Sequence, residues 1–271
     1  MRPVFINSAS VRAPERLLLK GGQWGMINLK VRYGFLAHPT LGPVLIDTGY
    51  GPRVTNGNER SLALKAYAAV LRPRLIAGNC ALPFLHSKGI QPDDVRTIII
   101  THFHADHVSA LLDFPKAHFL LSRKVWESFV GSGQFGNLRH GVFGELIPAN
   151  FAERMTFFET LPMVKLGDPF GHGYDVLGDG STLAIDLPGH AAGHSGLLFT
   201  DGPRPLLYAT DVQWLPLAIT ENRAPGFPAT RIYDDANAAI NSAAKVRAFA
   251  ASEGDFLLCH QPQSHDCDVS L

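Results

Sequence analysis

The sequence Thr101-His102-Phe103-His104-Ala105-Asp106-His107 places four side chains that can bind metals within six residues. It follows Ile98-Ile99-Ile100, an apolar run typical of a strand buried on both faces, so the polar residues begin where that strand should end. Because alternate residues of an extended chain point to the same side, His102 and His104 can face one cation. The chain then turns, and it can deliver Asp106 and His107 to a second cation.

The chemistry of these four side chains suits zinc, since three of them are imidazoles and the fourth is a carboxylate. A single histidine at the end of a strand is usually a surface or capping residue. Three histidines and an aspartate this close together would repel one another or stay unsatisfied without a cation. The spacing therefore predicts a metal site at the end of this strand.

The composition is that of an ordinary globular protein, with 46% hydrophobic and 18% charged residues in a chain of 271. Basic and acidic residues are equal at 24 each and form no basic block, which disfavours nucleic acid as a partner. No apolar stretch reaches about eighteen residues, so we expect no membrane span. The amino terminus shows no signal-peptide pattern, and a cytoplasmic location is expected.

The cysteines are three in number and show no CxxC spacing, so neither a disulfide framework nor a thiolate zinc site is expected from Cys80, Cys259 and Cys267. Cys259 adjoins His260 and is interpreted as a buried bystander.

Apolar and alternating runs bounded by glycine, proline and aspartate predict strands, and amphipathic runs that begin at a serine or aspartate predict helices. The expected strands are residues 26–39, 44–49, 98–100, 117–121, 155–159, 174–177, 182–187, 195–200, 206–210 and 255–259. The expected helices are residues 61–71, 82–88, 122–130 and 234–252, with another helix starting at Val108. This order matches an α/β (α+β) chain folded as an αββα sandwich, in which each half gives one sheet and an outer helical layer. No linker or repeat divides the chain, so residues 1–271 are expected to form a single domain.

Residues 131–148 differ from their surroundings, because five glycines alternate with apolar residues. This composition is too apolar for a solvated linker and too glycine-rich for a helix. A mobile lid over a cleft and an ordinary surface loop packed on the core are equally compatible with it.

Two motifs resemble the metallo-beta-lactamase superfamily. Residues 102–107 resemble its first metal motif, His-x-His-x-Asp-His, letter for letter. Residues 188–195, Pro-Gly-His-Ala-Ala-Gly-His-Ser, resemble its Pro-Gly-His-x-x-Gly-His-Ser, in which the first histidine is a ligand. The resemblance implies the metallo-beta-lactamase fold and a site for two metal ions.

The ligands that the resemblance implies lie at the ends of apolar runs. Asp211 follows Leu207-Tyr208-Ala209-Thr210, and His260 follows Phe256-Leu257-Leu258-Cys259, so both can meet the first motif at one rim of the sandwich. By resemblance, metal one takes His102, His104 and His190, metal two takes Asp106, His107 and His260, and Asp211 bridges them.

Two further residues are expected to support the ligands. Asp47 lies in an Asp-Thr-Gly sequence where the superfamily places an aspartate that orients a metal-binding histidine, although a turn or capping role is also compatible. His194 is interpreted as making a structural hydrogen bond.

The chemistry that the resemblance implies is hydrolysis at two Zn²⁺ ions about 3.5 to 4 Å apart, although iron and manganese accept the same ligands. Zinc lowers the pKa of bound water to about 7. A bridging hydroxide would attack, one zinc would stabilise the oxyanion, and Asp106 would relay the proton to the leaving oxygen.

In length and ligand set the chain looks most like the N-acyl homoserine lactonase-like group of quorum-quenching hydrolases. There is one departure, because those lactonases carry a tyrosine three residues after the bridging aspartate, where this chain has Trp214, which has an indole N–H and no phenol. An apolar pocket suited to an acyl chain is expected from residues that are equally compatible with plain core: Trp24, Met26, Phe103, Phe143 and Trp214.

The expected function is a dinuclear zinc hydrolase that opens a lactone or small ester, with N-acyl homoserine lactone as one candidate among small-molecule substrates. Two alternatives stay open. One is a hydrolase of the same fold that acts on a phosphodiester, a thioester or a beta-lactam, and the other is a non-catalytic ligand-binding member. The complete ligand set favours catalysis, and both a monomer and a homodimer are compatible with the sequence.

Overall fold

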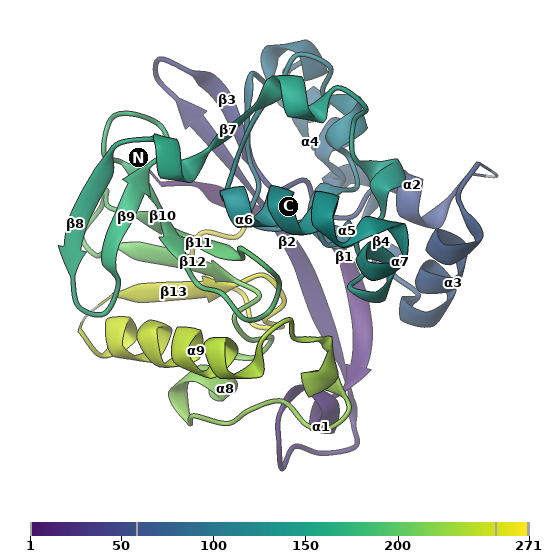
Figure 1. Cartoon of the computed structure of the whole chain (residues 1–271), viewed down its shortest axis with the longest axis vertical. Coiled ribbons are helices and arrows are strands. Elements are labelled where there is room, and N and C mark those ends of the chain that lie inside the picture. Colours follow the sequence, from purple (N-terminus) through teal and green to yellow (C-terminus); the bar gives the residue numbers. More distant parts are fainter. Residues whose placement is uncertain (1, 58, 253, 270–271) are drawn as a thin grey trace.

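Two β-sheets lie at the centre of the molecule and helices lie outside them (Figure 1). The computed structural model describes residues 2–57, 59–252 and 254–269. Within these ranges, seven strands form one sheet in the order β4-β1-β2-β3-β5-β6-β7, and six strands form the other in the order β13-β12-β11-β10-β9-β8. Each half of the chain gives one sheet, which confirms the expected αββα sandwich.

The first sheet brings two functional loops to one edge. Strands β3, β5, β6 and β7 run parallel, so their carboxyl ends face the same way. Asp47 follows β3 directly, and His102 lies three residues after β5 ends. The strands of this sheet are β1 (Val4–Pro14), β2 (Met26–His38), β3 (Gly42–Ile46), β4 (Arg74–Leu75), β5 (Thr97–Ile99), β6 (His118–Leu121) and β7 (Met155–Phe157).

The second sheet is antiparallel except for its pair β12 and β13, which run parallel. This pair therefore directs Asp211 and His260, which follow the two strands, to the same edge. The strands are β8 (Met163–Gly167), β9 (Gly171–Asp175), β10 (Thr182–Asp186), β11 (Ser195–Phe199), β12 (Leu206–Thr210) and β13 (Asp255–Leu258).

The helices form the two outer layers, with α8 and α9 along the second sheet and α2 to α7 on the side of the first (Figure 1). Two of them begin at the expected serines, because Ser61 accepts a hydrogen bond from Leu64 N–H and Ser122 accepts one from Lys124 N–H. None of the helices in the described ranges has the length and apolar character needed to cross a membrane. They are α1 (Glu15–Leu18), α2 (Pro52–Thr55), α3 (Leu62–Leu71), α4 (Ala81–Ser87), α5 (Ala105–Val108), α6 (Arg123–Gly131), α7 (Gly133–Arg139), α8 (Pro216–Thr220) and α9 (Ala236–Ala251). Short 3-10 helices span Ala77–Asn79, Pro92–Asp94, Leu111–Asp113, Gly144–Leu146, Phe151–Arg154, Phe158–Thr160 and Ala229–Ile232.

The largest buried cluster joins the two sheets, since Val31 and Ile98 of the first sheet belong to it together with Leu197 and Tyr208 of the second. A second cluster fills the space between the second sheet and α9. Burial of this continuous apolar surface is the main stabilising contribution to the sandwich. We propose on this basis that the chain is a single domain.

Several features of the fold differ from the sequence interpretation, which also did not include β4 or the short helices α1, α2 and α8. Strand β1 was not expected, because a β-bulge between Asn7 and Ala9 interrupts its alternation, and the Asn7 side chain accepts a hydrogen bond from Val31 N–H at 2.9 Å instead. Strand β8 was also missed. The helix expected from Val108 onward is wrong, because α5 ends there: the carbonyl of His107 accepts from Thr48 N–H at 2.7 Å rather than continuing the helix.

Residues 131–148 contain a helix, α7, which the glycine content had argued against. Asn137 in this helix donates its amide N–H to the carbonyl of Phe129 at 2.8 Å, so α7 is fastened to the end of α6. Tertiary contact therefore overrides the weak helix propensity of glycine. Phe143 is buried in the core, whereas Phe135 on α7 is 85% exposed.

We expect Gly189→Ala to lower the free energy of unfolding by about 3 kcal/mol or more. Gly189 has a φ of +125°, and an added Cβ would lie 2.1 Å from the amide nitrogen of Ala239 at the start of α9. Gly178→Ala is the matched control, because its φ is +80° but nothing lies within 4 Å, and it should cost about 1 kcal/mol. Urea unfolding measures both changes, and equal losses would contradict the close approach at Gly189.

Candidate metal centre

The structure brings all seven expected ligand side chains together at the edge where the two sheets meet. They come from the turn after β5, from α5, and from the ends of β10, β12 and β13. All seven are buried: His102, His104, Asp106, His107, His190, Asp211 and His260.

One group of ligand atoms is formed by three histidines and Asp211. His104 Nδ1 lies 3.1 Å from His102 Nε2 and 2.9 Å from His190 Nε2. His190 Nε2 lies 3.3 Å from Asp211 Oδ2. Ligands on a tetrahedral zinc are separated by roughly 3.3 to 3.5 Å, given its bond lengths to nitrogen and oxygen. The spacing therefore fits a shared cation, and we propose that these four side chains bind one.

The other group also contains Asp211. His260 Nε2 lies 3.1 Å from Asp211 Oδ2 and 3.3 Å from Asp106 Oδ2, and His107 Nε2 lies 3.5 Å from Asp211 Oδ2. Within the described part of the chain, His107 Nε2 and Asp211 Oδ1 are buried without a hydrogen-bond partner. Buried polar atoms normally have a partner, so these two atoms fit the presence of a cation.

Cys259 is buried, and its Sγ lies within 4.8 Å of ligand atoms of His107, Asp211 and His260. The sequence interpretation treated Cys259 as a bystander, and only its position next to His260 could have suggested otherwise. Burial raises the pKa of the thiol, but the charges of His260 and His107 outweigh burial and lower it. The Cys259 thiol donates to the carbonyl of Arg32 at 3.4 Å.

Hydrogen bonds on the far side of the rings orient the ligands. Asp47 Oδ2 accepts from His107 Nδ1 at 2.8 Å, and the same carboxylate accepts from the amide and hydroxyl of Thr101. His260 Nδ1 donates to the carbonyl of Lys30 at 2.8 Å. Such contacts fix which ring nitrogen points at the centre. We therefore propose that Asp47 positions His107, as the resemblance implied.

His194 lies beside the two ligand groups but belongs to neither. Its Nδ1 donates to the carbonyl of Leu187 at 2.7 Å, and its Nε2 accepts from Asp211 N–H at 3.2 Å and also contacts the Thr210 hydroxyl. His194 thus makes structural hydrogen bonds and holds the backbone that carries Asp211.

The two groups differ in charge. Burial lowers the pKa of His102 and His190 well below the usual value and lowers the pKa of His104 to about 4, so these rings are neutral at pH 7. Burial also disfavours charge on His107 and His260, but Asp211 and its neighbours outweigh burial and raise both pKa values. Without a cation, the second group therefore holds protons and the first does not.

We expect the second equivalent of Zn²⁺ to bind with a strong pH dependence and the first with little. His107 and His260 have raised pKa values, so each must release a proton to bind a cation near pH 7, and affinity should rise about tenfold per pH unit for each proton released. The three histidines of the first group are already neutral. Calorimetric titration between pH 6 and pH 8, in buffers of different ionisation enthalpy, counts the protons. Equal slopes for both equivalents would refute this difference.

The segment that carries His260 is fastened by a buried arginine. Arg32 donates to Asp268 Oδ1 at 2.7 Å and Oδ2 at 2.9 Å, and to the carbonyls of Gln261 and Gln263 at 2.7 Å each. The Arg32 side chain is fully buried, and burial of an unpaired charge is costly. This role was not predicted, because Arg32 lies in an alternating strand where a polar residue is expected to face solvent.

We expect Asp268→Asn to lower the free energy of unfolding by about 3 kcal/mol or more, because it leaves the buried charge of Arg32 without its carboxylate. It should also weaken zinc binding at the His260 side, read as the zinc retained on dialysis against a chelator. Asp266→Asn changes an exposed carboxylate in the same segment and should leave both measurements unchanged. An Asp268→Asn protein with normal stability and zinc content would show that the arginine does not hold this segment.

The expected apolar pocket is only partly assembled. Trp24 and Met26 are 70% and 48% exposed, and Trp24 lies against Arg16, so neither is held in an apolar lining. Phe103 and Phe143 are buried in the main core. Trp214 is buried with its ring centroid 6.3 Å from that of His190, so it lies beside the first ligand group.

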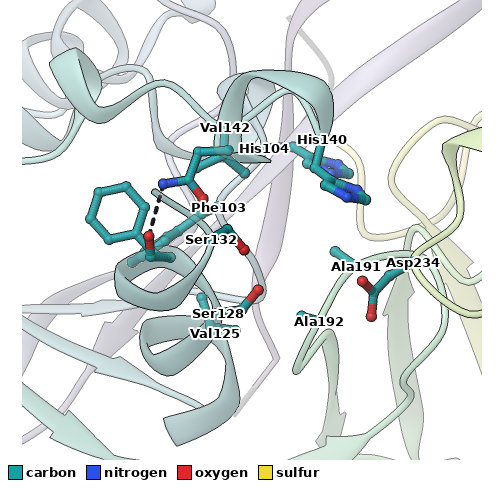
Figure 2. A pocket seen from close by; sticks show the side chains of 12 residues that line it. Phe103, His104, Val125, Ser128, Ser132, His140, Val142, Ala191, Ala192 and Asp234 are labelled. Atoms are coloured by element: carbon teal, nitrogen blue, oxygen red, sulfur yellow. Dashed lines mark hydrogen bonds between the residues drawn. The ribbon is translucent and has the colours of Figure 1, made fainter. Parts of the chain in front are cut away.

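A groove opens directly beside the first ligand group, with His104 and Phe103 in its wall (Figure 2). It runs between α6, the end of α7 with the residues that follow it, and the turn after β10. Its polar residues were not identified from the sequence, because single serines and an asparagine in a glycine-rich stretch carry no recognisable pattern.

Two tyrosines also escaped the sequence interpretation. The hydroxyls of Tyr50 and Tyr67 lie 2.8 Å apart. Burial raises the pKa of Tyr67, and the charge of Asp106 raises it further, so its phenol is neutral.

A buried cluster of histidines and carboxylates at the edge of an αββα sandwich is the arrangement expected of a metal-dependent hydrolase. A model of the metallo-beta-lactamase superfamily matches residues 33–252, and the chain belongs to this superfamily. It is a metal-dependent hydrolase, in agreement with its relatives.

The relatives include N-acyl homoserine lactonase AttM from Rhizobium radiobacter, which is 29% identical over 252 residues, or 92% of this chain and 89% of that protein. An N-acyl homoserine lactone hydrolase solved with N-hexanoyl-L-homoserine at its catalytic metal centre has a TM-score of 0.70 and 19% identity, covering 96% and 93% of the two chains. AidC, a dizinc quorum-quenching lactonase, has a TM-score of 0.64 and 14% identity, covering 96% and 87%. These two structures support the fold.

Proposed function

We propose that this protein is a dinuclear zinc hydrolase that opens a lactone ring or a small ester, with N-acyl homoserine lactone as the first candidate. The observation that carries the proposal is the position of Asp211, whose Oδ2 is within 3.5 Å of His190, His107 and His260 Nε2 atoms from both ligand groups. One carboxylate placed between two groups of histidines suits two cations. The AttM relative, similar over most of both chains, supports the choice of a lactone.

The donor set fits zinc, because it combines imidazole nitrogens and carboxylate oxygens. When bound, zinc supplies two kinds of chemistry: it lowers the pKa of water to about 7, and it polarises a carbonyl oxygen. A dizinc structural relative supports zinc over iron or manganese. The buried position of the seven side chains limits access of bulk water to the reacting atoms.

Asp106 is proposed to move the proton. Burial disfavours its charge, but His107 and His260 outweigh burial and hold its pKa at about 2, so before a cation binds the carboxylate is ionised at neutral pH. When the ester bond breaks, the departing alkoxide needs a proton, and a positioned carboxylic acid can return it. Asp106 Oδ2 stays within 3.3 Å of His260 Nε2, which keeps the carboxylate at the centre.

This chain has Trp214, not a tyrosine, three residues after Asp211, but the phenol of Tyr233 lies beside Trp214. Tyr233 stacks on Trp214 with ring centroids 6.1 Å apart, and its ring lies 6.2 Å from that of His190. Its hydroxyl donates to Gln213 at 3.2 Å. The Trp214 indole N–H is therefore the donor proposed to face a substrate carbonyl from the side of the first group, and the Tyr233 hydroxyl would have to turn away from Gln213 to join it.

We expect zinc-loaded protein to contain two zinc ions per chain and to open N-acyl homoserine lactones in a pH-stat assay faster than it cleaves phosphodiesters, thioesters or beta-lactams. Asp106→Asn should lower kcat by about 100-fold or more, because it removes the proton carrier. Asp93→Asn, the same change at an exposed carboxylate paired with Lys116, should leave kcat unchanged. Cleavage of a phosphodiester but of no lactone would contradict the proposed substrate class. Full turnover by an Asp106→Asn protein that still holds two zinc ions would remove Asp106 from the mechanism.

A further inference from the structure

The groove beside His104 is continuous with the first ligand group, because His104 itself forms part of the wall. A substrate whose reacting carbonyl lies at the metal centre must place the rest of its structure nearby. The groove is one such space, because His104 lies in its wall. The residues that line the groove therefore favour some substituents on the substrate, here called its arm, over others.

The floor of the groove is apolar. Phe103 is 3% exposed and packs edge-on against Phe129 of α6 with ring centroids 5.4 Å apart. Val125 and Val142 extend this surface. Methylene groups of an arm can be buried here.

The rim of the groove is polar. Ser128 and Ser132 lie one helical turn apart, and Figure 2 shows their hydroxyls turned toward the space that faces Ala191 and Asp234. Throughout residues 2–57, 59–252 and 254–269, no group is hydrogen-bonded to the side chains of Ser128, Ser132, His140 or Asp234. The side-chain amide of Asn137 donates to the carbonyl of Phe129, and within the described part of the chain its side-chain oxygen accepts no hydrogen bond.

An apolar floor with a hydrogen-bonding rim suits a particular kind of arm. A plain alkyl chain would cover the hydroxyls and the amide without giving them a partner, which is unfavourable. A hydroxyl or keto oxygen on the arm would accept or donate hydrogen bonds there. The exposed Asp234 carboxylate disfavours an arm that ends in a negative charge.

Resting on the proposed lactone hydrolysis, we propose that the groove binds the acyl arm of the substrate and selects a short arm that carries a hydroxyl or keto group over a plain alkyl arm. Ser128 and Ser132 are the specificity-determining residues. They act on binding of the arm and take no part in breaking the ester bond.

The test compares homoserine lactones whose six-carbon arms are unsubstituted, 3-hydroxylated or 3-oxidised, together with an unsubstituted twelve-carbon arm. We expect kcat/KM to be about tenfold higher for the oxygenated six-carbon arms than for the plain one, as two hydrogen bonds would give. The Ser128→Ala, Ser132→Ala double variant should reduce this ratio to about one and leave the plain arm within about twofold. Ser87→Ala, in a helix away from the groove, is the control and should keep the ratio.

The outcomes separate this inference from the proposed function. If lactones are opened but the plain twelve-carbon arm is preferred, or the double variant keeps the ratio, the groove proposal is wrong and the lactonase proposal stands. If no lactone is opened, the lactonase proposal fails. The groove proposal is then tested by comparing the binding of 3-hydroxyhexanamide with that of hexanamide. Tighter binding of the hydroxylated amide by zinc-loaded protein, lost in the double variant, would support the groove. Equal binding would overturn it.

Discussion

The site depends on Asp211, a carboxylate that is 2% exposed and lies between 3.1 and 3.9 Å from nitrogens of four histidines. A buried carboxylate is costly unless neighbouring groups compensate its charge. Four imidazoles surround it, and the His194 ring holds its backbone, so its position is strongly determined. Because β12 and β13 run parallel, the same edge also presents His260, and the second sheet thus supplies the centre of a cluster that the first sheet completes.

This arrangement gives the two halves of the cluster different electrostatic characters. The half with His102, His104 and His190 is dominated by burial, which keeps its rings neutral. The half with His107 and His260 is dominated by carboxylates, which favour the charged rings. Histidine side chains thus acquire opposite protonation states from their surroundings. The difference between the two halves follows from the number of carboxylates that each half contains.

Much of the fold and of the metal site could be predicted from the sequence, but for different reasons in different places. The run from His102 to His107 is local, so its spacing alone predicted a metal site at a strand end. Asp211 and His260 are single residues at the ends of ordinary strands, and only resemblance to a superfamily connected them. The contact between Arg32 and Asp268 joins residues 236 positions apart and has no local pattern. Helix α7 was not expected, because the contact that fastens it to α6 cannot be read from its glycine content. Trp24 was expected in a pocket or in the core and is exposed, because hydrophobicity alone does not show where a side chain packs.

The pairing of Arg32 with Asp268 also has a consequence for the order of events during synthesis. His102 and its neighbours leave the ribosome early, whereas one of the anchors of the segment with His260, the contact between Arg32 and Asp268, involves a carboxylate that follows it in the chain. A nascent polypeptide can therefore fold its first sheet while the cluster is still open. The complete cluster can assemble only after His260 has emerged, and the contact that fastens its segment to Arg32 is complete only once Asp268 follows.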